Sequence, residues 1–331
     1  MRNAKKLDAV FEGGGVKGTG LVGAVEITEQ KGYVFENVAG ASAGAIVASL
    51  IAAGYTAKEM KEIMLKIDYS KFKDEGLEDK IPLVGKPLSL FLEKGIYEGE
   101  YFLNWIRELL AAKGVHQFRD LIMPEYQDDL RYRYKLNVIA SDITRGRLII
   151  LPEDIADYGK DPDELEVAWA VRMSMSIPYF YKPVVLEDRE GNSHYIVDGG
   201  ILSNYPVWIF DDGTINPAWP TFGYKLVEPD AGKPHTIRGP ITLLAALFST
   251  MMEAHDARYI KDANFIRTIP IETLGIQTTD FDMIHERKEA LYESGKKAAE
   301  DFFSRWDFAT YKAQLKEKEK THRRHRIWRQ S

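Results

Sequence analysis

Cysteine is absent from the 331 residues of the chain. Its absence excludes disulfide bonds, thiolate metal sites and a cysteine nucleophile, and it fits a reducing compartment. Long apolar runs are absent as well, because no segment approaches the roughly 18 apolar residues that a membrane-spanning helix needs. The basic start of the chain is not followed by the apolar stretch that marks a signal peptide. We therefore expect a cytoplasmic protein that meets membranes only at their surface.

An excess of positive charge is also missing. The chain has 44 Lys and Arg against 50 Asp and Glu, a net charge of -6, which does not favour nucleic acid as a partner. Its seven histidines show no zinc-type spacing beside an acid. The sequence thus predicts no zinc-type metal site and no nucleic-acid partner.

What the chain does contain is an alternation of strand-like and helix-like segments. Short apolar runs at 7–11 and 33–41 are typical of buried strands, and helical patterns follow them at 18–31 and 43–53. Such alternation indicates an α/β sheet, and we expect one large domain. Further strands are expected at 135–143, 146–152 and 194–200, helices at 56–67, 101–113, 242–260 and 287–306, and a loop dense in Pro, Gly and Asp over 210–240.

Ser42 stands between Gly40 and Gly44 in the pattern G-x-S-x-G, after a predicted strand and before a predicted helix. In a nucleophile elbow the serine occupies a strained turn, where larger side chains two residues away would collide with the strand or the helix. The turn also places the serine at a helix N-terminus, whose unpaired N–H groups favour developing negative charge. The alternative, that Ser42 merely caps the helix, is equally open at this point.

A glycine-rich loop, EGGGVKG at residues 12–18, also follows a strand and opens a helix. Consecutive glycines let backbone N–H groups converge on one point, which suits an oxyanion hole. The same residues fit the dinucleotide pattern G-x-G-x-x-G, and Glu36 lies near the spacing of a ribose-binding acid, although its strand runs at once into the Ser42 turn. A plain tight turn is the third possibility. The loop contains Gly13, Gly14, Gly15, Lys17 and Gly18.

Asp198 ends a predicted strand and is followed by Gly199 and Gly200. An acid at this place can project into the active-site cleft of an open α/β sheet, or it can simply form a turn. Together the three motifs supply a nucleophile, an acid that could act as a base, and anion-stabilising backbone, which are the parts of an acyl-transfer site. No histidine stands in a recognisable base motif.

These motifs resemble those of the bacterial patatin-like phospholipases. That family combines a G-G-G-x-[RK]-G loop, a G-x-S-x-G elbow and a D-G-[GA] motif, which match residues 13–18, 40–44 and 198–200. The likeness covers nearly the whole chain up to about residue 311. Glu12 departs from the pattern, since many members carry Asp there, but it should not affect the backbone donors. Other stretches that resemble bacterial members lie at 93–121, 139–154, 168–184 and 278–298.

The resemblance implies a three-layer α/β/α fold with a mostly parallel central sheet, and a cofactor-free serine lipid acyl hydrolase with a Ser–Asp dyad. Ser42 would attack the ester carbonyl and form an acyl-enzyme, and Asp198 would accept the serine proton. Backbone N–H groups of residues 13–15 would hold the oxyanion, with Lys17 near it. The substrate would be a phospholipid or another fatty-acyl ester.

An ordinary Asp has a pKa of about 3.9, so such a dyad needs a dry site that strengthens the Ser–Asp hydrogen bond and raises that pKa. An acyl chain in an apolar pocket would provide this dryness. Each candidate for the wall of this pocket could instead simply pack in the core. The candidates are Met173, Met175, Ile177, Tyr179, Phe180 and Tyr181.

Other functions remain open from the sequence. The same chemistry could serve a carboxylesterase or thioesterase that acts on soluble esters. A dinucleotide-binding protein would make Ser42 incidental. A degenerate family member that binds lipid without cleaving it is disfavoured, because Ser42 and Asp198 are both present.

Residues 312–331 form a basic tail with eight Lys or Arg against two acids. We expect a patatin-like domain at 1–311, followed by this tail. The tail is either a solvated helix end or a patch for anionic lipid head groups, with Trp328 as an interfacial anchor.

Overall fold

The structure is a computed structural model of the chain. It describes residues 5–72, 97–178, 180–211, 214, 216–229, 237, 246, 250, 265–278 and 280–317.

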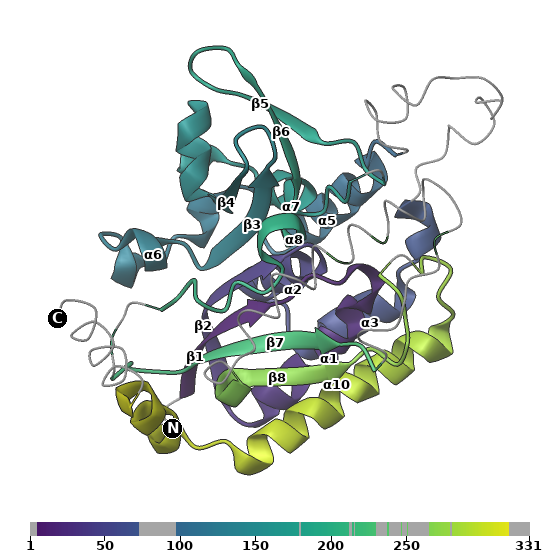
Figure 1. Cartoon of the computed structure of the whole chain (residues 1–331), viewed down its shortest axis with the longest axis vertical. Coiled ribbons are helices and arrows are strands. Elements are labelled where there is room, and N and C mark those ends of the chain that lie inside the picture. Colours follow the sequence, from purple (N-terminus) through teal and green to yellow (C-terminus); the bar gives the residue numbers. More distant parts are fainter. Residues whose placement is uncertain are drawn as a thin grey trace.

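A mixed sheet organises the described part of the chain, in the order β5-β6-β3-β2-β1-β7-β8, with β4 paired to β3 off this path (Figure 1). Neighbours from β3 to β8 along this order are parallel, whereas β4, β5 and β6 join antiparallel. The expected α/β fold with a mostly parallel central sheet is confirmed. The strands are β1 (Lys5–Phe11), β2 (Tyr33–Ala41), β3 (Leu136–Asp142), β4 (Arg147–Leu151), β5 (Val184–Glu187), β6 (Ser193–Asp198), β7 (Thr221–Val227) and β8 (Thr268–Glu272).

Helices cover the sheet, and Figure 1 shows α10 running along the lower side of the molecule next to α1. None of the helices in the described residues is both long and apolar enough to cross a membrane. The helices are α1 (Gly18–Gln30), α2 (Ala43–Ala52), α3 (Ala57–Lys66), α5 (Glu100–Ala112), α6 (Leu130–Arg133), α7 (Val167–Ser174), α8 (Gly200–Ser203) and α10 (His285–Arg305).

Strand β1 shows how the two faces of the sheet are used. Leu7 and Phe11 belong to the large apolar core, which also includes residues of α1, α2 and α10. Val10 points to the opposite face, where it packs with Ala39 and Phe210. Alternate residues of one strand are therefore buried on both faces, as expected for a central parallel strand.

The prediction of a loop over 210–240 is wrong in its centre, because β7 occupies residues 221–227 between β1 and β8. The flanking Pro, Gly and Asp residues obscured a short buried strand. Strands β5 and β8 were not predicted either, and β8 contains Pro270, which an edge strand tolerates. The helix predicted at 242–260 lies almost wholly outside the described residues.

The boundary predicted between residues 311 and 312 falls inside a helix, since residues 308–317 are helical. Tyr311 is buried, so the first turns of this helix pack against the domain. Residues 318–331, with most of the basic side chains of the predicted tail, lie outside the described residues.

Candidate active site

Strand β3 brings the ends of β2 and β6 together. Val138 and Ile139 of β3 pair with both β2 and β4, so β2 and β4 lie on opposite edges of β3. Residues 140–142 of β3 pair with both β4 and β6, so β6 lies on the same edge of β3 as β2. Ala41, the last residue of β2, pairs with Ile139, and Asp198, the last residue of β6, pairs with Ala140. The two strands run in opposite directions and meet end to end, which places Asp198 beside Ser42.

Ser42 has the backbone of a nucleophile elbow, with φ 51° and ψ -126°. This left-handed region is strained for a residue other than glycine. A Cβ at Gly40 would lie 2.3 Å from the carbonyl carbon of Gly44, and a Cβ at Gly44 would lie 2.1 Å from the Phe11 carbonyl oxygen. Ser42 precedes α2, yet its side chain makes no capping hydrogen bond. The helix-capping alternative is therefore wrong, and both glycines are needed for close packing.

Ser174 at the end of α7 holds the elbow in place. The Ser42 N–H donates to Ser174 Oγ (2.8 Å), and Ser174 Oγ donates to the Ile139 carbonyl oxygen (2.5 Å). The buried Ser42 Oγ lies 3.5 Å from Met175 Sδ, to which it donates. A thioether is a weak acceptor, so this contact leaves the hydroxyl able to turn to a stronger one.

Asp198 is a buried and poorly satisfied carboxylate. Its Oδ1 accepts from the Gly200 N–H (2.8 Å), whereas Oδ2 has no hydrogen-bond partner in the described part of the chain. Burial raises the pKa of Asp198 to about 7, against the lowering effect of the Gly200 N–H. A carboxyl with a pKa near neutrality is suited to accept a hydroxyl proton and to return it.

The glycine loop presents two backbone donors beside this pair. A Cβ at Gly13 would lie 3.0 Å from Ser42 Cβ, so the loop borders the nucleophile. Gly13, expected as a donor, is already engaged, because its N–H donates to the Asn204 carbonyl oxygen (3.2 Å). The N–H groups of Gly14 and Gly15 have no acceptor among the described residues. These two groups are the donors open to an oxyanion.

Lys17 does not present a free cation to the site. Its buried Nζ donates to Glu228 Oε1 at 2.8 Å. A Cβ at Gly14 would come within 3.4 Å of Lys17 Cε, so the lysine stem lies against the glycine loop. In this conformation Lys17 supports the loop and is neutralised by Glu228.

The other motif glycines shape the same corner. Gly18 is the first residue of α1, which therefore begins directly after the loop. A Cβ at Gly199 would lie 2.3 Å from the Ile139 carbonyl oxygen, so a larger residue would push β6 away from β3. Gly200 begins α8 and supplies the N–H that Asp198 accepts.

Glu12 is a structural residue whose importance the sequence analysis missed. Its buried carboxylate pairs with Lys225 Nζ (2.6 Å) and accepts from the Leu226 N–H and from Asn204 Nδ2 (3.3 Å). Through these bonds it ties the glycine loop to β7. The available signal was a charged residue placed directly after a buried strand, where an unpaired charge would be costly.

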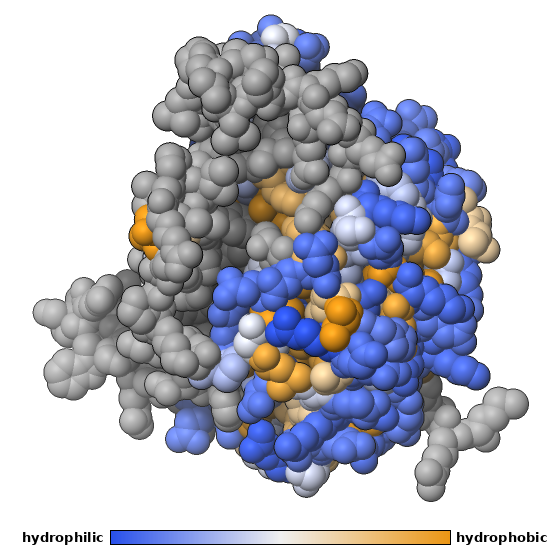
Figure 2. Space-filling model, turned by 90° about the vertical axis from the view of Figure 1, so that its right-hand side faces the viewer, coloured by the Kyte–Doolittle hydropathy of each residue, from blue (hydrophilic) through white to orange (hydrophobic). Residues whose placement is uncertain are grey.

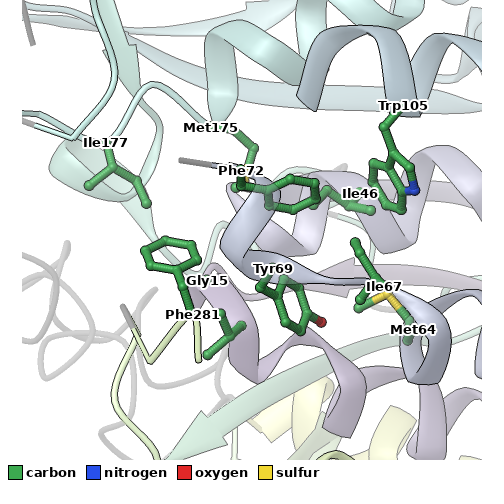
Figure 3. A pocket seen from close by; sticks show the side chains of 11 residues that line it. Gly15, Ile46, Met64, Ile67, Tyr69, Phe72, Trp105, Met175, Ile177 and Phe281 are labelled. Atoms are coloured by element: carbon green, nitrogen blue, oxygen red, sulfur yellow. The ribbon is translucent and has the colours of Figure 1, made fainter. Parts of the chain in front are cut away.

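An apolar pocket extends from this corner and is shown in Figure 3. The expected wall residues Met175 and Ile177 line it. Phe180 lies behind the wall, with its ring stacked on that of Phe281 (4.6 Å between centroids). Tyr181 and Met173 are buried core residues, as the competing interpretation held, and Tyr179 lies outside the described residues. The lining side chains that the sequence analysis did not anticipate come from other segments: Val16, Ile46, Met64, Ile67, Tyr69, Phe72, Trp105 and Phe281.

Figure 2 shows the side of the molecule towards which β7 and β8 run, and there apolar patches lie between hydrophilic residues. In the chain that connects β8 to α10, Leu274 and Ile284 are 45% and 59% exposed. Exposed apolar residues at the carboxyl end of the sheet are compatible with contact to an apolar substrate surface.

The histidines that the structure describes make no hydrogen bond to the Ser42 and Asp198 side chains. His116 and His285 are exposed, and His194 is buried at the start of β6. The described residues also contain no cluster of acids and histidines able to hold a metal ion. The other histidines, 235, 255, 322 and 325, lie outside the described residues.

His194 joins two acids on neighbouring segments. Its Nδ1 lies 3.0 Å from Asp142 Oδ2, and its Nε2 lies 3.1 Å from Asp188 Oδ2. A carboxylate only accepts hydrogen bonds, so the imidazole bridges the two acids as a donor. Asp142 also accepts from Tyr158 Oη (2.7 Å). This buried clasp fastens β6 to the end of β3 and to the β5–β6 turn.

Glu36 is not placed as a ribose-binding acid. It lies in the middle of β2, where it accepts from Lys6 Nζ (2.7 Å) and from Tyr126 Oη (3.2 Å). Its carboxylate is thus bound on the strand and not at the glycine loop. The geometry disfavours the dinucleotide alternative.

A strained serine at a strand–helix turn, a buried acid without a full set of donors and an adjoining glycine loop form one site. The family model of the patatin-like phospholipases matches residues 9–211, which contain all three elements. The chain belongs to this family. It is an ester-bond hydrolase of the lipid acyl hydrolase type.

Relatives of the family extend the match. The chain is 40% identical over 303 residues to YqhO of Bacillus subtilis (strain 168), covering 91% of this chain and 99% of that one. It is 28% identical over 212 residues to the triacylglycerol lipase ptl3 of Schizosaccharomyces pombe, covering 62% of this chain and 39% of that one. The crystal structure of VipD from Legionella pneumophila has the same fold, with a TM-score of 0.54, 18% identity, and coverage of 91% and 67% of the two chains.

Proposed function

We propose that the protein is a serine lipid acyl hydrolase that cleaves fatty-acyl esters of phospholipids or related lipids through a Ser42–Asp198 dyad. The observation that carries the proposal is the pairing of a strained, buried serine with an acid whose pKa burial raises to about 7. A base with that pKa is partly ionised at neutral pH and needs no histidine between itself and the hydroxyl.

The chemistry follows from the positions of the groups. Ser42 Oγ attacks the ester carbonyl while its proton passes to Asp198. The tetrahedral oxyanion accepts from the N–H groups of Gly14 and Gly15. Collapse breaks the ester C–O bond, the leaving alkoxide takes the proton from Asp198, and the acyl group stays on Ser42. Water then attacks the acyl-enzyme with Asp198 as base, which releases the fatty acid and restores the serine.

The dry surroundings of the dyad favour a lipid substrate. The pocket beside Ser42 is walled almost entirely by apolar side chains, which suit an acyl chain and would exclude water once filled. We further propose that the protein reaches its substrate by peripheral contact with membranes or lipid aggregates. A carboxylesterase or thioesterase that acts on soluble esters would use the same dyad and is the second candidate.

The test compares phospholipid vesicles with a short-chain p-nitrophenyl ester below and above the concentration at which the ester forms micelles. We expect fatty acid release from the vesicles, a rate increase on micelle formation, and loss of both in Ser42→Ala. Hydrolysis of the monomeric ester without release from vesicles would favour the esterase. Hydrolysis of either substrate by Ser42→Ala near the wild-type rate would contradict the dyad.

A further inference from the structure

The connection between β8 and α10 borders the glycine loop. The Val16 N–H donates to the Thr278 carbonyl oxygen (3.2 Å), and a Cβ at Gly15 would lie 2.1 Å from that oxygen. Phe281 and Met283 are buried and anchor the connection on its inner side. Its outer surface therefore lies beside the candidate active site.

Leu274 occupies a position in this connection where the backbone disfavours leucine. The turn from Thr273 to Ile276 is closed by a hydrogen bond from the Ile276 N–H to the Thr273 carbonyl oxygen (3.0 Å). Its central residues, Leu274 and Gly275, both have positive φ, 55° and 72°. Turns with two positive φ values are dominated by Gly, Asn and Asp. The Leu274 side chain is 45% exposed, so packing in the core offsets little of this strain.

Ile284 occupies a second such position, the N-cap of α10. Its carbonyl oxygen accepts from the N–H groups of Arg287 (3.2 Å) and Lys288 (3.3 Å), but its side chain makes no capping hydrogen bond. Ser, Thr, Asp and Asn are preferred at an N-cap, because their side chains accept from the free N–H groups of the first turn. The Ile284 side chain is nevertheless 59% exposed. At both ends of one connection, an exposed apolar side chain thus stands where the local backbone favours a polar residue or glycine.

The charges nearby indicate which lipid surface these two side chains would fit. Three exposed acids, Glu272, Asp282 and Glu286, lie within two residues of them in the chain, against one exposed base, Arg287, three residues away. An anionic membrane would repel this excess of acids. Apolar side chains gain free energy by leaving water whatever the charge of the lipid. A zwitterionic lipid surface therefore fits this segment best.

We propose that Leu274 and Ile284 form a lipid-docking surface, which inserts into the zwitterionic surface of a membrane or lipid aggregate and brings the candidate active site to its substrate. The proposal rests on the proposed function, because a lipid surface is the partner that a lipid acyl hydrolase must meet. The side of the molecule towards which β8 runs carries apolar patches (Figure 2). Local stability is lost at both positions, as is common where a residue serves function.

The test measures binding of the full chain to phosphatidylcholine vesicles by co-sedimentation, in the Ser42→Ala background so that no lipid is consumed. Leu274→Asn and Ile284→Ser should each lower the partition coefficient by about fivefold to tenfold, because about half of each apolar side chain is available for burial in lipid. The loss should be the same at low and at high salt. In the active chain, the ratio of vesicle hydrolysis to monomeric-ester hydrolysis should fall by a similar factor.

Both variants should at the same time fold better, which separates loss of docking from damage to the fold. Asn tolerates the positive φ at position 274, and Ser supplies the capping hydroxyl that α10 lacks. Each substitution should therefore raise the melting temperature by about 1–3 °C. Val34→Thr is the matched control, because Val34 is 47% exposed but lies at the start of β2, at the opposite end of the parallel strands. It should leave vesicle binding unchanged.

The proposal is overturned if the parent chain does not bind phosphatidylcholine vesicles, or if a variant with both Leu274→Asn and Ile284→Ser binds them equally well. An equal loss of binding in Val34→Thr would also overturn it. A double variant that keeps vesicle binding but loses self-association in size-exclusion chromatography would make the surface a protein interface. Ester hydrolysis by Ser42→Ala near the wild-type rate would instead contradict the proposed function and leave the docking result standing.

Discussion

Two acids on either side of strand β6 have opposite surroundings. Asp188, which directly follows β5, accepts from His194 Nε2 (3.1 Å) and Arg145 Nη2 (3.2 Å), and His194 and backbone N–H groups hold its pKa well below its usual range. Asp198, at the end of β6, accepts one backbone N–H at 2.8 Å, and burial raises its pKa to about 7. Deep burial with few donors makes Asp198 a proton acceptor, whereas several donors make Asp188 a structural charge.

The largest effect is expected where the poorly satisfied acid meets the serine. Ser42→Ala and Asp198→Asn should each lower ester hydrolysis by about 10⁴-fold or more, as loss of a nucleophile or its base does in serine hydrolases. Steady-state assays on a short-chain ester measure this loss, and circular dichroism verifies the fold. Activity of either variant within about tenfold of wild type would break the comparison, since Asp198 would then be no proton acceptor.

Removing the His194 partner of Asp188 should lower the stability of the protein much more than its turnover. His194→Asn removes the imidazole between Asp142 and Asp188 and leaves the buried Asp142 carboxylate without one of its donors, which costs about 1–3 kcal/mol of unfolding free energy. Urea denaturation measures it. Turnover per folded molecule should fall far less than in Asp198→Asn, and the exposed His285→Asn provides the control. A kinetic loss as large as that of Asp198→Asn, with stability unchanged, would assign His194 to the chemistry.

These expectations differ in how far the sequence alone supports them. The elbow at Ser42 and the strand-ending Asp198 could be predicted, because the glycines, the apolar strand and the helix that define each lie within about ten residues. The α/β sheet followed from the alternation of strands and helices, and its mostly parallel order followed from the resemblance to the patatin-like family. Each of these features is a local pattern of the chain.

The rest depends on contacts between distant segments. The clasp at His194 forms only when three segments meet, and Glu12 is important only because β7 lies beside β1. Gly13 was expected to donate to the oxyanion, yet Asn204, far away in the sequence, takes its N–H. The pocket walls on α2, α3 and α5 were missed for the same reason, since residues from several helices converge there.

Variants of the glycine loop beside the Ser42–Asp198 dyad should lower turnover by a smaller factor than variants of the dyad itself. Gly15→Ala should reduce turnover by about 10²–10³, the usual result of losing an oxyanion donor, because Gly15 has a φ of 57° and the new Cβ would lie 2.1 Å from the Thr278 carbonyl oxygen and displace the backbone. Lys17→Ala should cost less, since Glu228 already neutralises the ammonium. Kinetics of both variants on one ester test this order, and a larger loss for Lys17→Ala would show that charge stabilises the oxyanion.

The smallest effect is expected for the basic residues of the C-terminal tail, which belong to neither acid's surroundings. Deletion of residues 318–331, chosen to keep the helix at 308–317 with its buried Tyr311, should not alter hydrolysis of a soluble ester. It should weaken binding to anionic vesicles at low salt, because each Lys or Arg near such a surface contributes about 1 kcal/mol, and the difference should vanish at high salt. Vesicle co-sedimentation measures this binding. Equal binding of the full and the shortened chain at low salt would favour the interpretation of the tail as a solvated helix end.

The most direct test of the dyad is the pH dependence of covalent labelling by a fluorophosphonate, followed by mass spectrometry of the intact protein and its peptides. Asp198 must be ionised to accept the Ser42 proton. Because its pKa is raised to about 7, the labelling rate should be low in acid, rise through about pH 7 and then stay level. We expect one adduct, on Ser42, and its near-complete loss in Asp198→Asn. An adduct on another residue, or a Ser42 labelling rate that is the same in acid and in base, would contradict the Ser42–Asp198 dyad.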